Sequence, residues 1–340
     1  MMPAPARTRI EAIAYALPTA TVTNAQLKEE YPGWDFERLE KRTGVFARHI
    51  AAKDETALDL AFRACEQMES EGALRREEID ALIFCTQSPD YIMPPNACIL
   101  HGKLGLKPEA LAFDITLACS GFVYGLQLAD SFLKSGAASR VLLATADTYT
   151  RFIHPGDRAT RCLFGDGGAV TILTHADSGG IRDILCRTAG KQYEKFIIPA
   201  GGMRVPCSAA TRTEAVDPSG NVRTAEHIKM DGLGVLSFFN NAVPCAVKDI
   251  LRRNQLSLAD VDVFVFHQAS QIALDSLRSA LGIPVEKMVY DLAEVGNLVA
   301  ASIPVALHRA LERGQARPGQ LALLCGFGVG LSWGAALVEL

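Results

Sequence analysis

Three side chains suited to acyl transfer stand at comparable places in the sequence. Cys119 follows the run DITLA and precedes Ser120 and Gly121, which open a helical stretch. His267 ends the apolar run VFVF, and Asn297 lies within EVGNLVAAS. A thiol can attack a thioester, and an imidazole with an amide can stabilise charge that develops on oxygen. Because a helix N-terminus favours the thiolate, the three residues indicate a cysteine-based acyl-transfer site.

An internal repeat predicts that these three residues meet. Three pairs of segments resemble one another in the same order: 77–88 with 259–270, 119–136 with 297–314, and 164–173 with 329–338. The first two offsets are 259 − 77 = 182 and 297 − 119 = 178 residues, so Cys85 falls opposite His267 and Cys119 opposite Asn297. Such a series indicates a duplicated α/β unit. Ligands bind at the carboxyl ends of strands in doubly wound folds, so matching strand ends are expected to face one another.

Short apolar runs alternate with stretches of helical period. The expected strands are 81–85, 141–146, 169–173, 263–267 and 321–325, and the expected helices are 56–71, 121–135, 238–254 and 270–281. This alternation predicts an α/β fold with mostly parallel sheets.

The connections and the domain division follow from the same pattern. We expect a hairpin at 176–183, where Ser178-Gly179-Gly180 separates two strand-like runs, and a surface excursion over the polar residues 201–227. The chain divides into an N-terminal half with the nucleophilic cysteine, 1–174, and a C-terminal half with the histidine and asparagine, 175–340.

Composition excludes several classes of function. The 340 residues carry 34 Lys+Arg against 38 Asp+Glu, which provides no basic field for nucleic acid. No apolar run approaches the roughly 20 residues of a membrane span, and no signal-peptide core follows the N-terminus. Nine cysteines without a Cys-x-x-Cys pair indicate reduced thiols in a cytoplasmic protein and no structural metal site.

Longer segments around these residues resemble the β-ketoacyl-acyl-carrier-protein synthase III family of thiolase-like condensing enzymes. The resemblance runs through KRTGVFARHIA (41–51), EEIDALIFCTQSPDYIMPPNACILHGKLGL (77–106), DITLACSGFVYGLQLA (114–129), LFGDGGAV (163–170), FHQAS (266–270), GNLVAASIPVAL (296–307) and GFGVGLSWGAALVEL (326–340). It implies a thiolase-like five-layer α-β-α-β-α fold built from two duplicated halves, and a homodimer. The family's catalytic triad falls on Cys119, His267 and Asn297, and no cofactor or metal is implied.

The implied reaction has two stages. Cys119 takes an acyl group from acyl-CoA, while backbone N–H groups at Cys119 and near Val329 hold the oxyanion. Malonyl-acyl carrier protein then loses carbon dioxide, His267 and Asn297 donate hydrogen bonds to the enolate, and condensation gives a 3-oxoacyl-acyl carrier protein.

The resemblance also implies substrate contacts. Arg42 and Arg158 are expected to bind the coenzyme A part of the donor, and Phe327 to lie at the pocket. Met93 stands where the family inserts a side chain into the acyl pocket of the partner subunit. Because methionine is flexible, Met93 predicts acceptance of chains longer than acetyl.

Some positions depart from the family pattern. Arg38 replaces a tryptophan that often stacks on adenine, and Ser270, an expected substrate contact, ends what is usually His-Gln-Ala-Asn. Ile272 replaces an arginine used to dock the carrier protein, with Arg278 as a nearby substitute. The change at Ile272 predicts a carrier protein different from that of housekeeping fatty-acid synthesis.

Other activities on the same fold remain open. One is an acyl-CoA-dependent acyltransferase that transfers the acyl group to oxygen or nitrogen in secondary metabolism, and another is a non-catalytic partner subunit. The intact triad favours condensation over both. A thiolase using Cys325, or a hydroxymethylglutaryl-CoA synthase, which would need a glutamate near Gln87, ranks lower.

Overall fold

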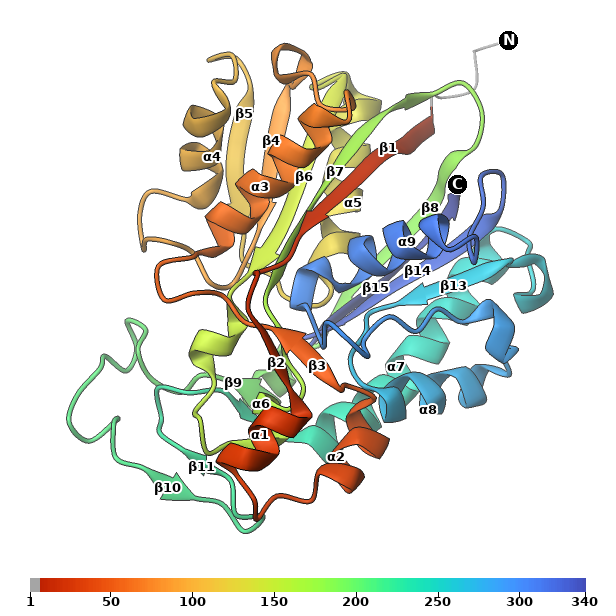
Figure 1. Ribbon diagram of the computed structural model, residues 1–340. Helices are drawn as coiled ribbons and strands as arrows, with labels where there is room; N and C mark the ends of the chain where they lie inside the picture. Colours follow the sequence, from red (N-terminus) through yellow and green to blue (C-terminus); the bar gives the residue numbers. More distant parts are fainter. Residues whose placement is uncertain (1–6) are drawn as a thin grey trace.

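Two mixed β-sheets form the framework of the protein (Figure 1). The computed structural model describes residues 7–340. The first sheet has the order β1 (Arg7–Ala16), β7 (Gly167–Ala176), β6 (Arg140–Asp147), β4 (Ala81–Cys85) and β5 (Leu111–Ile115). The second has the order β13 (Val263–Phe266), β14 (Leu321–Gly328), β15 (Ser332–Glu339) and β8 (Gly180–Thr188).

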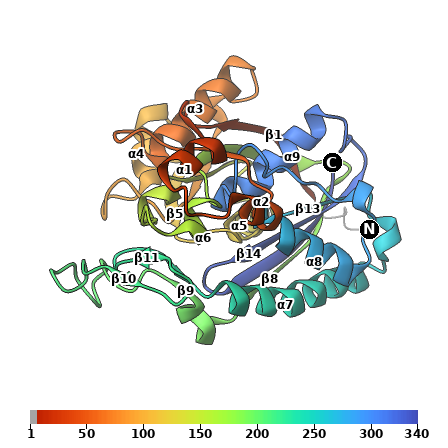
Figure 2. The same ribbon diagram turned by 60° about the horizontal axis from the view of Figure 1, so that its bottom comes forward.

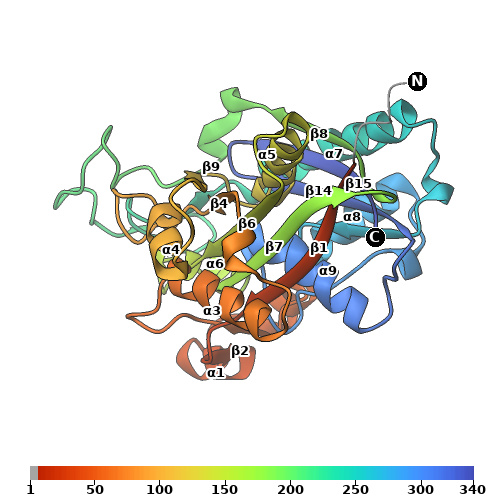
Figure 3. The ribbon, with the colours of Figure 1, turned by 90° about the horizontal axis from the view of Figure 1, so that it is seen from above.

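Helices complete five layers, seen edge-on in Figure 3. Helices α3 (Ala57–Ser70) and α4 (Asn96–Leu104) cover the outer face of the first sheet. Helices α5 (Gly121–Ser135) and α9 (Ser302–Glu312) lie between the sheets, and α7 (Gly232–Arg253) and α8 (Gln271–Leu281) cover the second. A separate apolar cluster fills each helix–sheet space, which stabilises the layers by removing apolar surface from water. The five-layer prediction is confirmed.

The two sheets repeat one pattern, as the internal sequence repeat predicted. Strands β1, β7, β6 and β4 stand in the same order as β8, β15, β14 and β13. Beside β4 lies the parallel strand β5, and beside β13 the single residue Met288 forms a parallel bridge with Phe264 in the equivalent place. The glycines after the two central helices, Gly136 and Gly314, both adopt the left-handed conformation, with φ of 74° and 70°.

Two expectations about the sheets were wrong. The sheets are not mostly parallel: β4 pairs parallel with β5 and β6, and β13 with β14, but all pairs made by β1, β7, β8 and β15 are antiparallel. Residues 176–183 do not form a hairpin, because β7 lies in the first sheet and β8 in the second. Gly179 and Gly180, with φ of 70° and 77°, carry the chain between the sheets. A glycine-rich turn between two apolar runs has the same sequence pattern whether the second strand returns to the same sheet or enters another. The division at 174/175 stays a prediction.

Shorter elements gather at one end of the sheets, the lower end in Figure 1 and the front in Figure 2. They are β2 (Thr21–Thr23), α1 (Asn24–Glu30), α2 (Phe36–Thr43), β3 (Ala47–His49), α6 (Arg158–Arg161), β9 (Phe196–Ile197), β10 (Ala215–Val216), β11 (Val222–Arg223) and β12 (Lys229–Met230). The expected excursion over 201–227 is confirmed, since this segment is mostly exposed and its hairpin β10–β11 reaches outward in Figure 2. Across residues 7–340, no helix combines the length and apolar character needed to span a bilayer.

Candidate active site

The residues expected to carry chemistry line one cavity at this end of the sheets. Its volume is about 1050 Å³, and Cys119, His267 and Asn297 all contribute to its wall. Their exposed fractions are 4%, 1% and 3%, so the three side chains lie at the inner end of the cavity. The structure therefore brings together the three residues that the repeat placed at matching strand and helix ends.

Cys119 directly precedes Ser120, the N-cap of α5, and is held by its neighbours. The Gly121 N–H donates to the Ala118 carbonyl at 2.7 Å, and the Ser120 and Ser332 hydroxyl oxygens lie 2.7 Å apart. A Cβ added at Gly328 would lie 2.6 Å from the Cys119 Cβ and 2.9 Å from its Sγ. The glycine therefore allows the β14–β15 turn to lie against the thiol.

Burial determines the resting protonation state of this thiol. Burial, together with the nearby Asp147 carboxyl, raises the pKa of Cys119, and the residue's own backbone N–H acts weakly in the opposite direction. The expected position at a helix N-terminus is observed. The pKa is raised where the helix N-terminus predicted a lowered one, because loss of solvation disfavours the charged form of the thiol. Reaction therefore requires a group that accepts the proton.

His267 is a neutral imidazole at the end of β13. Its backbone N–H donates to the Cys325 carbonyl at 2.8 Å, which extends the pairing of β13 with β14. Its ring meets the Phe327 ring edge-to-face at 5.6 Å between centroids. Burial lowers the pKa of His267 to about 3, so the ring is uncharged in the resting site at neutral pH. A neutral imidazole can accept a proton or donate a hydrogen bond, as acyl transfer requires.

Asn297 is held in a fixed orientation. Its backbone N–H donates to the Leu163 carbonyl at 2.9 Å, and its carbonyl accepts from Gly165 N–H at 3.1 Å. The Val299 N–H donates to its Oδ1 at 2.9 Å, which assigns the acceptor side of the amide. Val299 adopts φ 55°, an uncommon conformation for a β-branched residue. Within residues 7–340 the Nδ2 group makes a single long contact, 3.4 Å, to the Ala269 carbonyl, and so remains available as a donor.

A buried carboxyl lies behind the nucleophile. Asp147 ends β6 with no exposed surface, and its Oδ1 accepts from Thr86 Oγ1 at 3.1 Å, Gln87 N–H at 2.8 Å and Ser88 Oγ at 3.1 Å. Its Oδ2 has no hydrogen-bond partner within the described chain. Burial raises the pKa of Asp147 to about 7. The sequence did not indicate this buried carboxyl, because an aspartate at a strand end is usually interpreted as a turn residue.

The cavity has an apolar wall and a charged opening. Phe164, Phe196 and Phe239 are among the apolar residues of the wall, and Phe327 lies there as expected. The expected contacts Arg42, Arg158 and Ser270 also line the cavity, together with Arg38 and Ile272 at the opening. A guanidinium is well suited to bind phosphate groups.

Three other residues singled out from the sequence are not part of this wall. Met93 is 78% exposed and is not among the residues that line the cavity of its own chain. Val329 lies beyond the lining residue Gly328, and its carbonyl accepts from Ser332 Oγ at 2.8 Å. Arg278 is turned back toward the Ile283 carbonyl and is not a lining residue.

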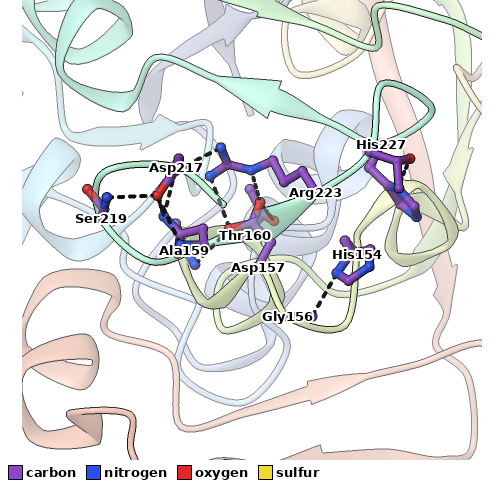
Figure 4. Close-up of polar contacts among 11 residues, drawn as sticks. His154, Gly156, Asp157, Ala159, Thr160, Asp217, Ser219, Arg223 and His227 are labelled. Carbon is purple, nitrogen blue, oxygen red and sulfur yellow. Dashed lines mark hydrogen bonds and ion pairs between the residues drawn. The ribbon is translucent and has the colours of Figure 1, made fainter. Parts of the chain in front are cut away.

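Sequence reasoning missed a polar cluster on the opening. Asp217, Ser219, Asn221 and Arg223, from the excursion, line the cavity. Ser219 contacts Arg158, and Arg223 contacts Asp157 at the start of α6 (Figure 4). Their spacing does not indicate a site, because the partners of Ser219 and Arg223 lie 61 and 66 residues earlier in the chain. In residues 7–340, no group of three or more His, Cys, Asp or Glu side chains is arranged to hold a metal ion.

Comparison with known proteins identifies the family. Residues 113–190 match the family model described as 3-oxoacyl-[acyl-carrier-protein (ACP)] synthase III, and residues 251–340 match the model of its C-terminal part. A Streptomyces coelicolor β-ketoacyl-[acyl-carrier-protein] synthase III is 37% identical over 323 residues, covering 94% of this chain and 93% of the relative.

Comparison with solved structures identifies the same family. A crystal structure of a 3-oxoacyl-(acyl-carrier-protein) synthase III superposes with a TM-score of 0.95 and 41% identity, covering 98% of this chain and all of the other. A Burkholderia xenovorans 3-oxoacyl-(acyl-carrier protein) synthase superposes with a TM-score of 0.91 and 33% identity, covering 98% and 94% of the two chains. The chain belongs to the β-ketoacyl-acyl-carrier-protein synthase III family.

Proposed function

We propose that this protein is a decarboxylating condensing enzyme that joins an acyl group from acyl-CoA to malonyl-acyl carrier protein. The observation that carries the proposal is the convergence of a thiol, a neutral imidazole and an oriented amide on one cavity. Membership of the synthase III family supports it. An acyltransferase acting on oxygen or nitrogen would not need the amide donor, so Asn297 favours condensation.

Acylation of Cys119 is the first stage. The thiol proton passes to the neutral His267 imidazole as the sulfur attacks the thioester carbonyl. The carbon–sulfur bond to coenzyme A then breaks, and the departing thiolate takes the proton, so the imidazole returns to its neutral state. Backbone N–H groups at Cys119 and near Val329 would stabilise the tetrahedral oxyanion.

Condensation is the second stage. The carboxylate of the malonyl group leaves as carbon dioxide, and its bonding electrons form the enolate of the thioester. His267 and the Nδ2 group of Asn297 donate hydrogen bonds to the enolate oxygen, where a carboxylate would repel the developing charge. The enolate carbon attacks the acyl group on Cys119, the thiolate leaves and is protonated from solvent, and a 3-oxoacyl-acyl carrier protein departs.

The opening of the cavity fits a phosphate-bearing donor. Arg38, Arg42 and Arg158 line it, and each guanidinium presents several donors to phosphate oxygens. Both coenzyme A and the carrier protein's prosthetic arm carry phosphate, so one opening would serve both substrates. A cytoplasmic location and the absence of a nucleic-acid partner remain predictions from composition.

A homodimer is the proposed assembly. Strand β5 is the edge of the first sheet, and its backbone is unpaired on one side within residues 7–340. Close along the chain, Tyr91, Ile92 and Met93 form an exposed apolar loop, 61%, 85% and 78% exposed. An open strand edge and an apolar patch of this kind both favour pairing with a second copy. Met93 would then reach the partner's acyl pocket.

One experiment separates the alternatives. The protein is incubated with a panel of acyl-CoAs, acyl-Cys119 is detected by intact mass, and malonyl-acyl carrier protein is then added. We expect a mass shift on Cys119, followed by carbon dioxide and a 3-oxoacyl product. Acylation without decarboxylation would support plain acyl transfer, and no acylation would support a non-catalytic subunit. Turnover confined to acetyl-CoA would contradict the longer-chain prediction from Met93.

A further inference from the structure

The hairpin β10–β11 forms one side of the cavity opening. Asp217 and Ser219 lie at its turn and Arg223 on β11, and all three line the cavity. Arg158, the first residue of α6, lines the same opening. The opening is therefore built from two segments that are 61 residues apart in the chain, measured from Arg158 to Ser219.

Arg223 joins these two segments. Its Nε donates to Asp157 Oδ2 at 2.6 Å and its Nη2 to Asp157 Oδ1 at 3.2 Å, while Nη1 donates to Asp217 Oδ2 at 3.0 Å (Figure 4). The side chains of Asp157 and Arg223 are 1% and 17% exposed. A two-point contact between guanidinium and carboxylate fixes geometry, and a buried carboxylate that loses its partner is strongly disfavoured.

Both carboxylates also hold the backbone beside them. Asp157 caps α6 by accepting from the Ala159 N–H at 3.1 Å. Asp217 Oδ1 accepts from the N–H groups of Ser219 and Asn221, each at 2.9 Å, and so closes the hairpin turn. One guanidinium therefore couples the start of a helix to the turn of the hairpin.

Arg158 is the residue at which this assembly borders the cavity opening. Its guanidinium donates to the Ser219 carbonyl, so the turn determines where the guanidinium lies. A guanidinium has five N–H donors, and those not used by Ser219 can bind a phosphate. The thioester of the donor must reach Cys119 at the inner end of the cavity, which leaves the phosphate-bearing part of coenzyme A at this opening.

We propose that Arg223 is a positioning residue that, through Asp157 and the hairpin turn, holds Arg158 at the opening and thereby gives the enzyme its preference for nucleotide-bearing acyl donors over short thioesters. The inference rests on the proposed function, because it assigns a specificity determinant to the same acylation reaction. Arg223 does not act on the reacting atoms, so the preference for one donor should change while the chemistry at Cys119 is preserved.

The test compares two donors that carry the same acyl group. Arg223→Met keeps the length of the side chain and removes its charge. The KM and kcat for Cys119 acylation are measured with acyl-CoA and with the corresponding acyl-N-acetylcysteamine, which lacks phosphate, and the Kd of free coenzyme A is measured by calorimetry. We expect the KM for acyl-CoA and the Kd to rise about tenfold, which corresponds to about 1.4 kcal/mol. We expect the constants for the short thioester to stay unchanged.

Arg212→Met is the matched control, since Arg212 lies on the same excursion, is exposed, pairs with Glu226 at 3.5 Å and does not line the cavity. Equal losses with both donors, or unchanged constants with both, would overturn the inference. If Arg223→Met does not fold, Asp217→Asn removes one of the two carboxylates and is expected to show the same split. If the unaltered protein acylates with neither donor, the proposed function fails, while the Kd of coenzyme A still tests the role of Arg223.

Discussion

Replacing Gly328 with alanine tests how closely the β14–β15 turn is fitted to the nucleophile. The new Cβ would lie 2.6 Å from the Cys119 Cβ and 2.9 Å from Sγ. Carbon atoms in contact normally lie about 3.5–4.0 Å apart, so the two segments must separate by about 1 Å. Rotation of the cysteine side chain would move Sγ but not Cβ, and therefore cannot relieve the clash. Overpacking of this kind costs about 1–3 kcal/mol.

The expected consequence is slow acylation. A displacement of about 1 Å at a reacting atom can lower the rate by about 10²-fold, so we expect Gly328→Ala to show a loss of that order in the rate of Cys119 acylation, followed by quenched-flow mass spectrometry. Thermal unfolding of the same variant should show the packing cost. Gly102→Ala is the control, because a Cβ at that helical position meets no atom within 4 Å. A Gly328→Ala enzyme with normal stability and a normal acylation rate would refute the close fit between this turn and the thiol.

Three further outcomes follow from the site and the assembly. Asn297→Asp should retain acylation and lose at least about 10²-fold in malonyl decarboxylation, because a carboxylate replaces an oxyanion donor; radiolabelled carbon dioxide measures this. Burial raises the pKa of Asp147 to about 7 from an unfolded value near 4, so the folded state binds the extra proton and stability falls as pH rises through that window. Between about pH 5 and pH 7 this proton contributes a fall of about 2–3 kcal/mol in the free energy of unfolding, which Asp147→Asn should remove. Urea titrations at several pH values measure this, and an unchanged pH dependence in the variant would contradict it. Ile92→Asp should weaken the dimer about 100-fold in light scattering, whereas the similarly exposed Val285→Asp should not; dimers of equal strength would contradict the proposed interface.

The sequence predicted those features that depend on short segments and their order. The repeat identified the equivalence of β4 with β13 and of α5 with α9, and thus placed Cys119, His267 and Asn297 at one end of the sheets. Apolar runs with turn residues on either side are local signals, so the central strands lie where they were expected. The family resemblance added Arg42, Arg158 and Phe327, which line the cavity.

What the sequence could not predict depends on the packing of the whole chain. The pKa of Cys119 is raised by burial, and burial is decided by segments such as β14 that lie about 200 residues away. The contact between Arg223 and Asp157 joins an irregular excursion to a short helix, and neither has a periodic pattern. The glycines between β7 and β8 permit either a hairpin or a crossing from one sheet to the other, so the local sequence does not distinguish the two.

The stoichiometry of the second stage tests decarboxylative condensation most directly. Cys119 is acylated and freed of excess acyl-CoA, malonyl-acyl carrier protein is added, and carbon dioxide is counted against acyl-enzyme consumed in a single turnover. We predict one carbon dioxide for each acyl-Cys119 lost, with the acyl group recovered in a 3-oxoacyl-acyl carrier protein. Loss of the acyl group without carbon dioxide would contradict condensation at this site.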